Sequence, residues 1–133
     1  MLNLAWNGRP SRIGEEEMFK HENRNWVEYR GLPSLREIDF HPVDGDDEFA
    51  FLAYYEKVER WKLRTLEALQ QAQSEGIQWV LFRHGHSTSH PGKQTARSVV
   101  RGVMRSKDAT PFIVRRECIQ QSSVFLAAIR PSG

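Results

Sequence analysis

The sequence of 133 residues has the length and composition of a single globular domain, with 39% hydrophobic and 27% charged residues. No apolar run is long enough to span a bilayer, and the N-terminal residues lack the apolar core of a signal peptide. We therefore expect a cytoplasmic protein without a membrane segment. Cys118 is the only cysteine, which excludes an internal disulfide and a multi-cysteine zinc site and is typical of a buried thiol.

A formal net charge of +2 conceals an uneven distribution of charge along the chain. Residues 1–76 contain 15 acidic and 10 basic side chains, whereas residues 77–133 contain 2 acidic and 9 basic ones. Clustered Lys and Arg side chains gain free energy by displacing counterions from phosphates, so the second half predicts a polyanionic partner, DNA or RNA. The alternative interpretation is that the acidic half neutralises the basic half within the fold. The oligomeric state is left open.

Residues 1–34 have the least regular pattern, and we interpret them as an N-terminal extension or edge arm. Within this extension, residues 26–30 mix large and polar side chains in a way that fits an edge strand. The α/β domain proper is expected over residues 35–133. Its first strand is predicted at residues 35–41, where apolar side chains alternate on one face before Pro42 ends the run.

A strand, helix, strand unit is expected at the start of this domain. Apolar residues recur at helical spacing from residue 47 to residue 74, and Gly76 stands where a C-terminal cap is expected. The apolar run at residues 77–82 predicts a second strand. Because a helical crossover joins the two strands, they should be parallel and should end at the same edge of the sheet.

The rest of the chain predicts a second helix at residues 93–107 and strands at residues 112–114 and 123–129. These last two strands are close enough in sequence to pair antiparallel. The predicted fold is therefore an α/β two-layer sandwich of β-α-β-α-β-β order, with a four-stranded mixed sheet and two main helices.

The carboxyl ends of the two parallel strands carry side chains that suit proton transfer. His41 and the turn at residues 83–86 are expected to face one crevice, where ligands of open α/β sheets bind. Imidazoles titrate near neutral pH and can act as base and acid on a phosphodiester. Asp39 shares a strand face with His41 and could orient a histidine or bind a metal ion. The candidate catalytic residues are Asp39, His41 and His84; the alternative for any one histidine is an ordinary loop position.

The turn and the helix that follows it also predict a phosphate site. A polar turn before a helix N-terminus is a common anion site, because the amide groups of the first helical turn are unpaired. Four cations recur every four residues on the helix and repel one another unless an anion lies along them; a solvated face is the alternative. The candidate binding residues are Arg83, Gly85, His86 and Ser87 in the turn and Lys93, Arg97, Arg101 and Arg105 on the helix.

His84, His86 and His90 lie in one loop, but few acidic or cysteine ligands accompany them. We therefore predict no metal site among these histidines. The pattern requires no cofactor, and participation of a divalent metal ion is left open.

Residues 35–131 resemble a divergent small-MutS-related (Smr) domain. Ile38-Asp39-Phe40-His41-Pro42 is similar to the Leu-Asp-x-His-Gly motif of that family, with proline in place of glycine. His84-Gly85-His86-Ser87 is similar to its His-Gly-x-Gly motif, without the second glycine, and residues 123–131 resemble its last strand. The resemblance implies the fold of the C-terminal domain of bacterial translation initiation factor 3. It also implies binding of structured nucleic acid, with DNA nicking or RNA cleavage, and roles for Asp39, His41, His84 and Gly85.

Two other functions compete with this interpretation. One is a non-catalytic module that binds nucleic acid or protein through the same basic face. The other is a phosphoesterase, because Arg83-His84-Gly85 is similar to the Arg-His-Gly motif of the histidine phosphatase superfamily. In that superfamily the motif lies near the N-terminus, with a further histidine far downstream. Here the later histidines, His86 and His90, lie in the same loop, so the usual phosphatase site cannot be assembled.

Overall fold

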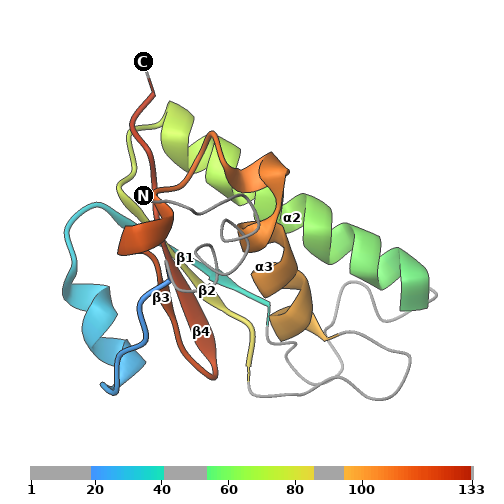
Figure 1. Ribbon diagram of the computed structural model, residues 1–133, viewed down its shortest axis with the longest axis horizontal. Helices are drawn as coiled ribbons and strands as arrows, with labels where there is room; N and C mark the ends of the chain where they lie inside the picture. The colour runs from blue at the N-terminus through green and yellow to red at the C-terminus, as the bar shows by residue number, and fades with distance from the viewer. Residues whose placement is uncertain (1–18, 41–53, 86–94, 133) are drawn as a thin grey trace, which may run out of the picture.

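The computed structural model describes residues 19–40, 54–85 and 95–132. Within them a four-stranded sheet has the order β1-β2-β4-β3, with β1 parallel to β2 and β4 antiparallel to both of its neighbours (Figure 1). The α/β fold with a mixed sheet and two main helices is thus confirmed. The elements are η1 (Trp26–Gly31), β1 (Leu35–Asp39), α2 (Tyr54–Ser74), β2 (Trp79–Arg83), α3 (Ala96–Arg105), η2 (Lys107–Ala109), η3 (Arg115–Glu117), β3 (Ile119–Gln120) and β4 (Val124–Ala128).

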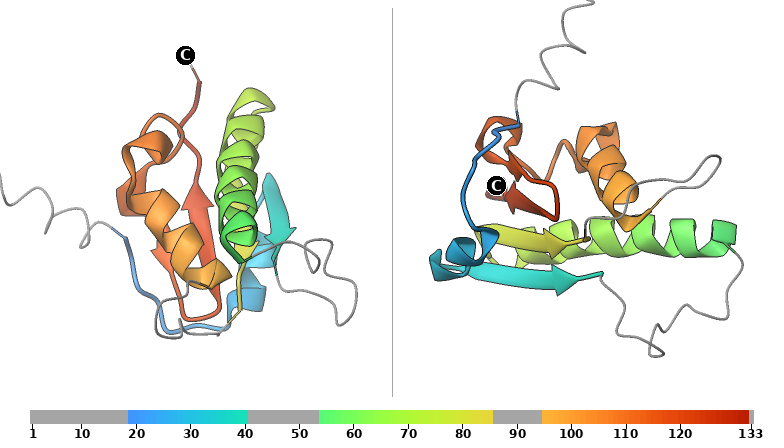
Figure 2. Two further views of the ribbon diagram at one scale, coloured as in Figure 1. Left: turned by 90° about the vertical axis from the view of Figure 1, so that its right-hand side faces the viewer. Right: turned by 90° about the horizontal axis from the view of Figure 1, so that it is seen from below.

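Helices α2 and α3 lie side by side on one face of the sheet (Figure 2). Their apolar faces and alternate residues of the central strands form the larger of two hydrophobic clusters. This cluster includes Val80 and Phe82 of β2, Phe125 and Ala127 of β4, Leu69 and Ala72 of α2, and Val100 and Met104 of α3. The stripe predicted for the second helix, Ala96, Val99, Val100, Val103 and Met104, is buried as expected.

The opposite face of the sheet is covered by the 3-10 helix η1. Tyr29 of η1 is buried against Leu81, Val124 and Leu126, the strand residues that point away from the long helices. Burial on both faces explains why β2 and β4 are almost continuously apolar, since a strand exposed on one face would alternate with polar residues.

The prediction of an edge strand at residues 26–30 is wrong, because these residues form η1. The side chain of Asn25 caps this helix by accepting a hydrogen bond from the backbone N–H of Val27. In a 3-10 helix, residues three apart lie on the same side, so Trp26 and Tyr29 both face the sheet. Burial of these two aromatic residues decides the local conformation, which their intrinsic preference for strands did not reveal.

The third strand is also misplaced in the prediction. Residues 112–114 form no strand, since Ile113 makes only an isolated bridge with Ile129 and η3 begins directly afterwards. Strand β3 is instead Ile119–Gln120, which the prediction assigned to a connection. The antiparallel pairing with the last strand is confirmed, but with β3 as the partner.

The outer edge of β3 is covered by the N-terminal part of the chain. Lys20 pairs with Ile119 in parallel, donating its backbone N–H to the carbonyl of Cys118 and accepting from the N–H of Gln120. Phe19 packs edge-on against Phe125 at a centroid distance of 5.0 Å. This pairing protects a short edge strand, which would otherwise leave backbone groups unpaired. A boundary at residue 34 stays a prediction.

The ends of both long helices have identifiable caps. Helix α2 ends at Ser74, and Gly76 follows with a φ of 76°, a left-handed conformation that suits glycine. Helix α3 begins after Thr95, whose hydroxyl accepts from the N–H of Ser98 in a capping box. Residues 47–53 and 93–94 of the predicted helices lie outside the described residues.

Helix α2 has 21 residues and so a length of about 31 Å. Its N-terminal turns extend past the strands in both views (Figures 1 and 2). In the described ranges, neither long helix is long and apolar enough to cross a membrane.

A polar cluster of Arg30, Glu37 and Arg83 around the Trp26 ring, which we call the clasp, joins η1 to the sheet. Arg30 donates two hydrogen bonds of 2.9 Å to the carboxylate of Glu37, and Arg83 donates one of 3.2 Å to the same carboxylate. Both guanidinium groups lie 4.8 Å from the centroid of the Trp26 ring. Since β1 contributes Glu37 and β2 contributes Arg83, the clasp holds two strands and η1 together.

Replacement of Glu37 by glutamine is expected to lower the free energy of unfolding at neutral pH by up to about 1 kcal/mol. The hydrogen bond from Arg30, and then that from Arg83, hold the pKa of Glu37 below its usual range. This stabilisation is therefore complete above the pKa of an unfolded Glu, about 4.3. It is lost as the pH falls through the lower pKa of the folded state. Urea denaturation at several pH values measures it.

The matched control is Glu59→Gln, because Glu59 is exposed and pairs with Lys62 at 3.5 Å on the same helix. Such a pair contributes little, so this variant should unfold nearly as the wild type does. Equal losses in the two variants would contradict a specific role for the clasp.

Candidate functional site

The turn between β3 and β4, residues Gln121 to Ser123, gathers the candidate residues. The backbone N–H groups of His84 and Gly85 both donate to the carbonyl of Ser123, at 3.2 and 3.0 Å. From α3, Arg97 donates to the carbonyl of Ser122 at 3.1 Å, and Arg101 donates to that of Gln121 at 3.0 Å. We call His84, Gly85, Arg97 and Arg101 the His84 cluster.

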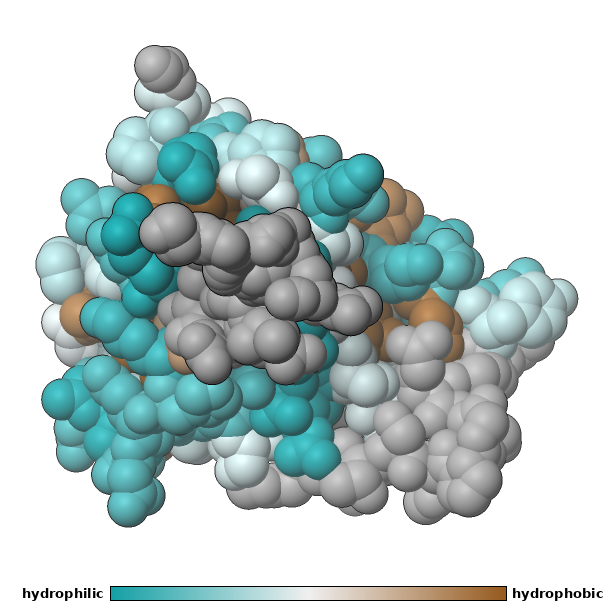
Figure 3. Space-filling model, viewed as in Figure 1, coloured by the Kyte–Doolittle hydropathy of each residue, from teal (hydrophilic) through white to brown (hydrophobic). Residues whose placement is uncertain are grey.

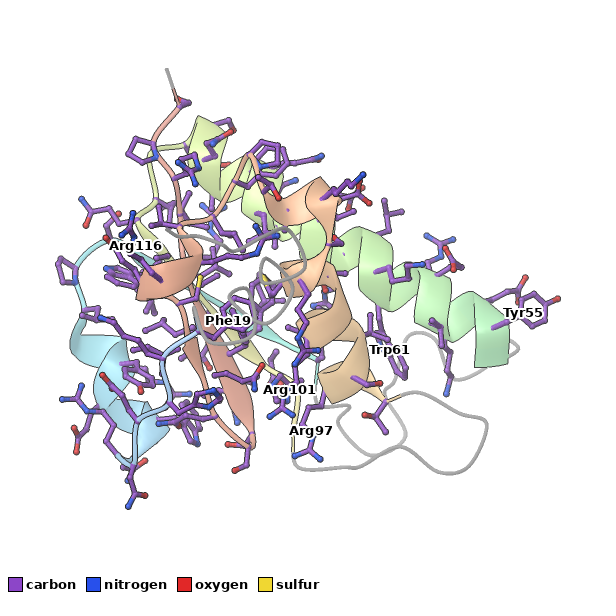
Figure 4. The ribbon with its side chains drawn as sticks, viewed as in Figure 1. Phe19, Tyr55, Trp61, Arg97, Arg101 and Arg116 are labelled. Atoms are coloured by element: carbon purple, nitrogen blue, oxygen red, sulfur yellow. The ribbon has the colours of Figure 1, made fainter. Side chains whose placement is uncertain are left out.

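Figure 4 shows Arg97 and Arg101 on the side of α3 that faces the end of β2 and the start of β4. The cluster therefore forms where the second parallel strand ends, at the edge of the sheet that the sequence predicted.

Gly85 makes the approach of β2 to the turn possible. Its φ of 84° is in the left-handed region, where a side chain would be strained. This conformation bends the chain directly after His84 and lets two successive N–H groups share one carbonyl. The glycine therefore has a backbone role in the cluster.

His84 is buried, with 5% of its surface exposed. Its Nδ1 lies 2.9 Å from the carbonyl oxygen of Gly85, and a carbonyl only accepts, so Nδ1 carries the proton. The other ring nitrogen, Nε2, is then an acceptor, and it is buried with no hydrogen-bond partner among the described residues. Burial, together with the charges of Arg101 and Arg97, lowers the pKa of His84 to about 4. The ring is therefore neutral at neutral pH.

The arginines of α3 form a row on one side of the helix. Arg97 and Arg101 are half-buried and Arg105 is exposed. Burial, and then the charges of Arg97 and Arg105, lower the pKa of Arg101. Over the described ranges, no carboxylate forms an ion pair with any of the three. The mutual repulsion predicted from the sequence is therefore left uncompensated within this part of the protein.

Arg83 and Asp39 do not join this cluster. They are register partners on β1 and β2, and Arg83 lies 3.3 Å from Asp39 and 3.2 Å from Glu37. Successive strand residues point to opposite faces, so these side chains lie on the face covered by η1. His84 follows Arg83 and lies with the α3 arginines instead. The turn at residues 83–86 was expected to face one crevice together with His41, but its first two side chains, Arg83 and His84, lie on opposite faces of the sheet. His41 lies outside the described residues.

Four of the predicted site residues lie outside the described residues, namely His41, His86, Ser87 and Lys93. Their roles stay predictions. In the part of the chain that is described, no group of three or more His, Cys, Asp or Glu side chains could hold a metal ion. Cys118 is buried, and this burial raises the pKa of its thiol to about 12, so it acts as an apolar core residue.

The turn residues Gln121, Ser122 and Ser123 were missed as part of the site. They act through backbone carbonyls, which every residue type has, so their identity carries little signal. The only signal is a short polar run before an apolar strand, which indicates a turn but not what the turn binds.

Comparison with protein-family models, with curated proteins and with solved structures finds no match for this chain. The geometry of the His84 cluster is therefore the basis for the function proposed below.

The buried neutral His84 predicts a decrease in stability below neutral pH. The unfolded chain binds a proton at this histidine below about pH 6.5, whereas the folded protein binds it only near a pKa of about 4. Stability is therefore highest above the unfolded value and falls by about 3 kcal/mol across this interval. Denaturation at several pH values should show this slope in the wild type and a smaller one in His84→Gln.

The control for this experiment is His21→Gln. His21 is exposed, so its replacement should leave the slope unchanged. If His84→Gln keeps the full slope, burial of a neutral His84 is not its source.

Proposed function

We propose that this protein binds nucleic acid through Arg97, Arg101 and Arg105, which we call the α3 arginine face. The observation that carries the proposal is the charge of this row, which no carboxylate of the described residues pairs with and which overlaps the His84 cluster at Arg97 and Arg101. Phosphates are the ligands that relieve such repulsion, and guanidinium groups bind them through paired N–H donors. The partner is DNA or RNA.

The arginines are also partly preorganised for this task. Arg97 and Arg101 each donate one N–H to a carbonyl of the β3–β4 turn. A guanidinium group has five N–H donors, so others remain for a phosphate. Anchoring reduces the side-chain entropy that binding would otherwise cost.

The surface supports a polar partner. On the face seen in Figure 3, the described residues are mostly hydrophilic, and hydrophobic residues occur only in small separate patches. Interfaces with nucleic acid are more polar and more positively charged than those between proteins. A protein-binding module without nucleic acid is therefore the weaker alternative.

We also propose that the domain is a divergent Smr member. Support comes from the four-stranded mixed sheet with two helices, and from His84-Gly85 at the end of the second strand. The departures from the family motifs concern Pro42 and Ser87, which lie outside the described residues.

Binding should weaken as salt is added, because each phosphate contact releases counterions. Arg105→Gln should weaken binding about equally for all sequences and lower the slope of log affinity against log salt by about one. Fluorescence anisotropy with labelled DNA and RNA stem-loops measures both quantities.

Arg60→Gln is the matched control. Arg60 is an exposed arginine on the other long helix, and its replacement removes the same charge. A long-range effect of net charge would act on both variants alike. If log affinity falls with log salt at the same slope in both variants, the proposal that the α3 arginine face binds specifically is wrong.

A second candidate function is phosphodiester cleavage by this site. The observation that favours it is the unpartnered Nε2 of His84, which could accept a proton from an attacking hydroxyl beside the two arginines. His41 remains a second candidate, whereas the ion pair of Asp39 with Arg83 gives Asp39 a structural role in this proposal.

Cleavage of labelled stem-loops, with a divalent metal ion or with a chelator, tests the enzyme. His84→Gln should reduce cleavage by about 10² to 10⁴ while keeping salt-sensitive binding. His41→Ala tests the second histidine in the same way. Binding by the wild type without cleavage under either condition would make the protein a recognition module. Turnover of a generic phosphomonoester lost in His84→Ala but kept in His41→Ala would favour the phosphatase instead.

A further inference from the structure

Two buried polar atoms in the His84 cluster have no hydrogen-bond partner within the described ranges. They are Nε2 of His84 and Nε of Arg101. A buried polar group without a partner costs about 1 to 3 kcal/mol, so a ligand that satisfies both atoms would gain affinity. The two atoms need different chemistry, and this difference restricts the ligand.

The His84 nitrogen needs a hydrogen-bond donor. Because the proton of the neutral ring is on Nδ1 and is donated to Gly85, Nε2 can only accept. A phosphate oxygen, which also only accepts, cannot satisfy it. The phosphates of a nucleic acid therefore leave this atom unpartnered.

The Arg101 nitrogen needs an acceptor. Its Nε–H is buried, while another nitrogen of the same guanidinium group donates to the carbonyl of Gln121. Arg101 and Arg97 donate to the carbonyls of Gln121 and Ser122, and the backbone N–H of His84 donates to that of Ser123, so the three residues meet at one turn. A group that both donates and accepts, placed next to a phosphate, matches the cluster.

We propose that the His84 cluster recognises the ribose 2′-hydroxyl of RNA. The hydroxyl donates to Nε2 of His84 and accepts from Nε of Arg101, while Arg97 and Arg105 hold the adjacent phosphates. This hydroxyl is the group that distinguishes RNA from DNA. The inference rests on the proposed function and names its substrate class.

Entry of a hydroxyl requires a side chain to move, because both atoms are shielded from solvent. Arg97 and Arg101 are the half-buried side chains of the cluster, and each is held to the turn by a hydrogen bond to one carbonyl. Exchange of these contacts for contacts with a phosphate would expose the imidazole. In this proposal, binding of a phosphate by the arginines gives the 2′-hydroxyl access to His84.

The test is binding of one stem-loop sequence in three chemical forms: RNA, 2′-fluoro RNA and DNA. The 2′-fluoro form keeps the A-form helix and adds no bulk, but it lacks the donor. We expect RNA to bind about tenfold more tightly than 2′-fluoro RNA, the effect of one buried hydrogen bond. Equal affinity for these two forms would overturn the inference.

Two variants locate the effect. His84→Phe removes the acceptor and should bring the RNA to 2′-fluoro ratio close to one, whereas His84→Gln keeps an acceptor and should preserve much of the ratio. A ratio unchanged in both variants would overturn the assignment to His84. The comparison of RNA forms uses the wild-type protein, so it stands even if a variant fails to fold.

Failure of the inference and failure of the proposed function are distinguishable. Salt-sensitive binding of all three forms with equal affinity would contradict only the 2′-hydroxyl inference. If none of the three forms shows salt-sensitive binding, the inference and the proposed nucleic-acid binding are both wrong.

Discussion

The turn between β3 and β4 is the constraint on which the rest of the structure depends. Its three backbone carbonyls accept from two arginines of α3 and from the N–H groups that end β2. On the other side, the side-chain amide nitrogen of Gln121 carries two hydrogens and lies 3.0 Å from each of three acceptors, the carbonyls of Glu22 and Arg24 and the hydroxyl of Tyr29. One turn thus joins the helical layer, the central strand and the N-terminal segment. A shift of this turn would disturb the candidate site and the packing of η1 together.

The arginines on the two faces of the sheet have different partners. On the η1 face, Arg30 and Arg83 are neutralised by Glu37 and Asp39. On the helical face, Arg97 and Arg101 donate to backbone carbonyls, which offer partial charge but no full negative charge. Among the basic residues of the second half of the sequence, Arg97, Arg101 and Arg105 therefore stand in one row on α3 without an ion pair to any carboxylate of the described residues.

Much of the architecture follows from local pattern. The parallel pairing of β1 with β2 was predictable because a buried apolar run follows a long amphipathic helix with a glycine cap. Strand β3 was not predictable in this way, since it has only two residues, Ile119 and Gln120, and is recognised only by their pairing with Leu126 and Phe125 of β4. The apolar residues 112–114 resemble a strand locally, but 3-10 helices flank them on both sides.

The candidate site was predictable to a similar extent. His84, Arg97 and Arg101 were identified from the sequence, and the structure brings them together. The separation of Arg83 from His84 follows from the two-residue period of a strand, but only when the faces of the sheet are known. The partner atoms of the arginines are backbone carbonyls, and the unpartnered state of Nε2 depends on tertiary packing. Neither has a signature in the sequence.

The strand order β1-β2-β4-β3 has a consequence for how the chain reaches this structure. Strand β4, the last to be synthesised, lies inside the sheet and supplies hydrogen bonds to both β2 and β3. The pairing of Lys20 with Ile119 likewise joins the two ends of the chain. During translation, the central sheet therefore cannot close until residue 128 has left the ribosome. Until then one hydrogen-bonding edge of β2 has no partner strand, and contacts between distant segments make closure of the sheet slow.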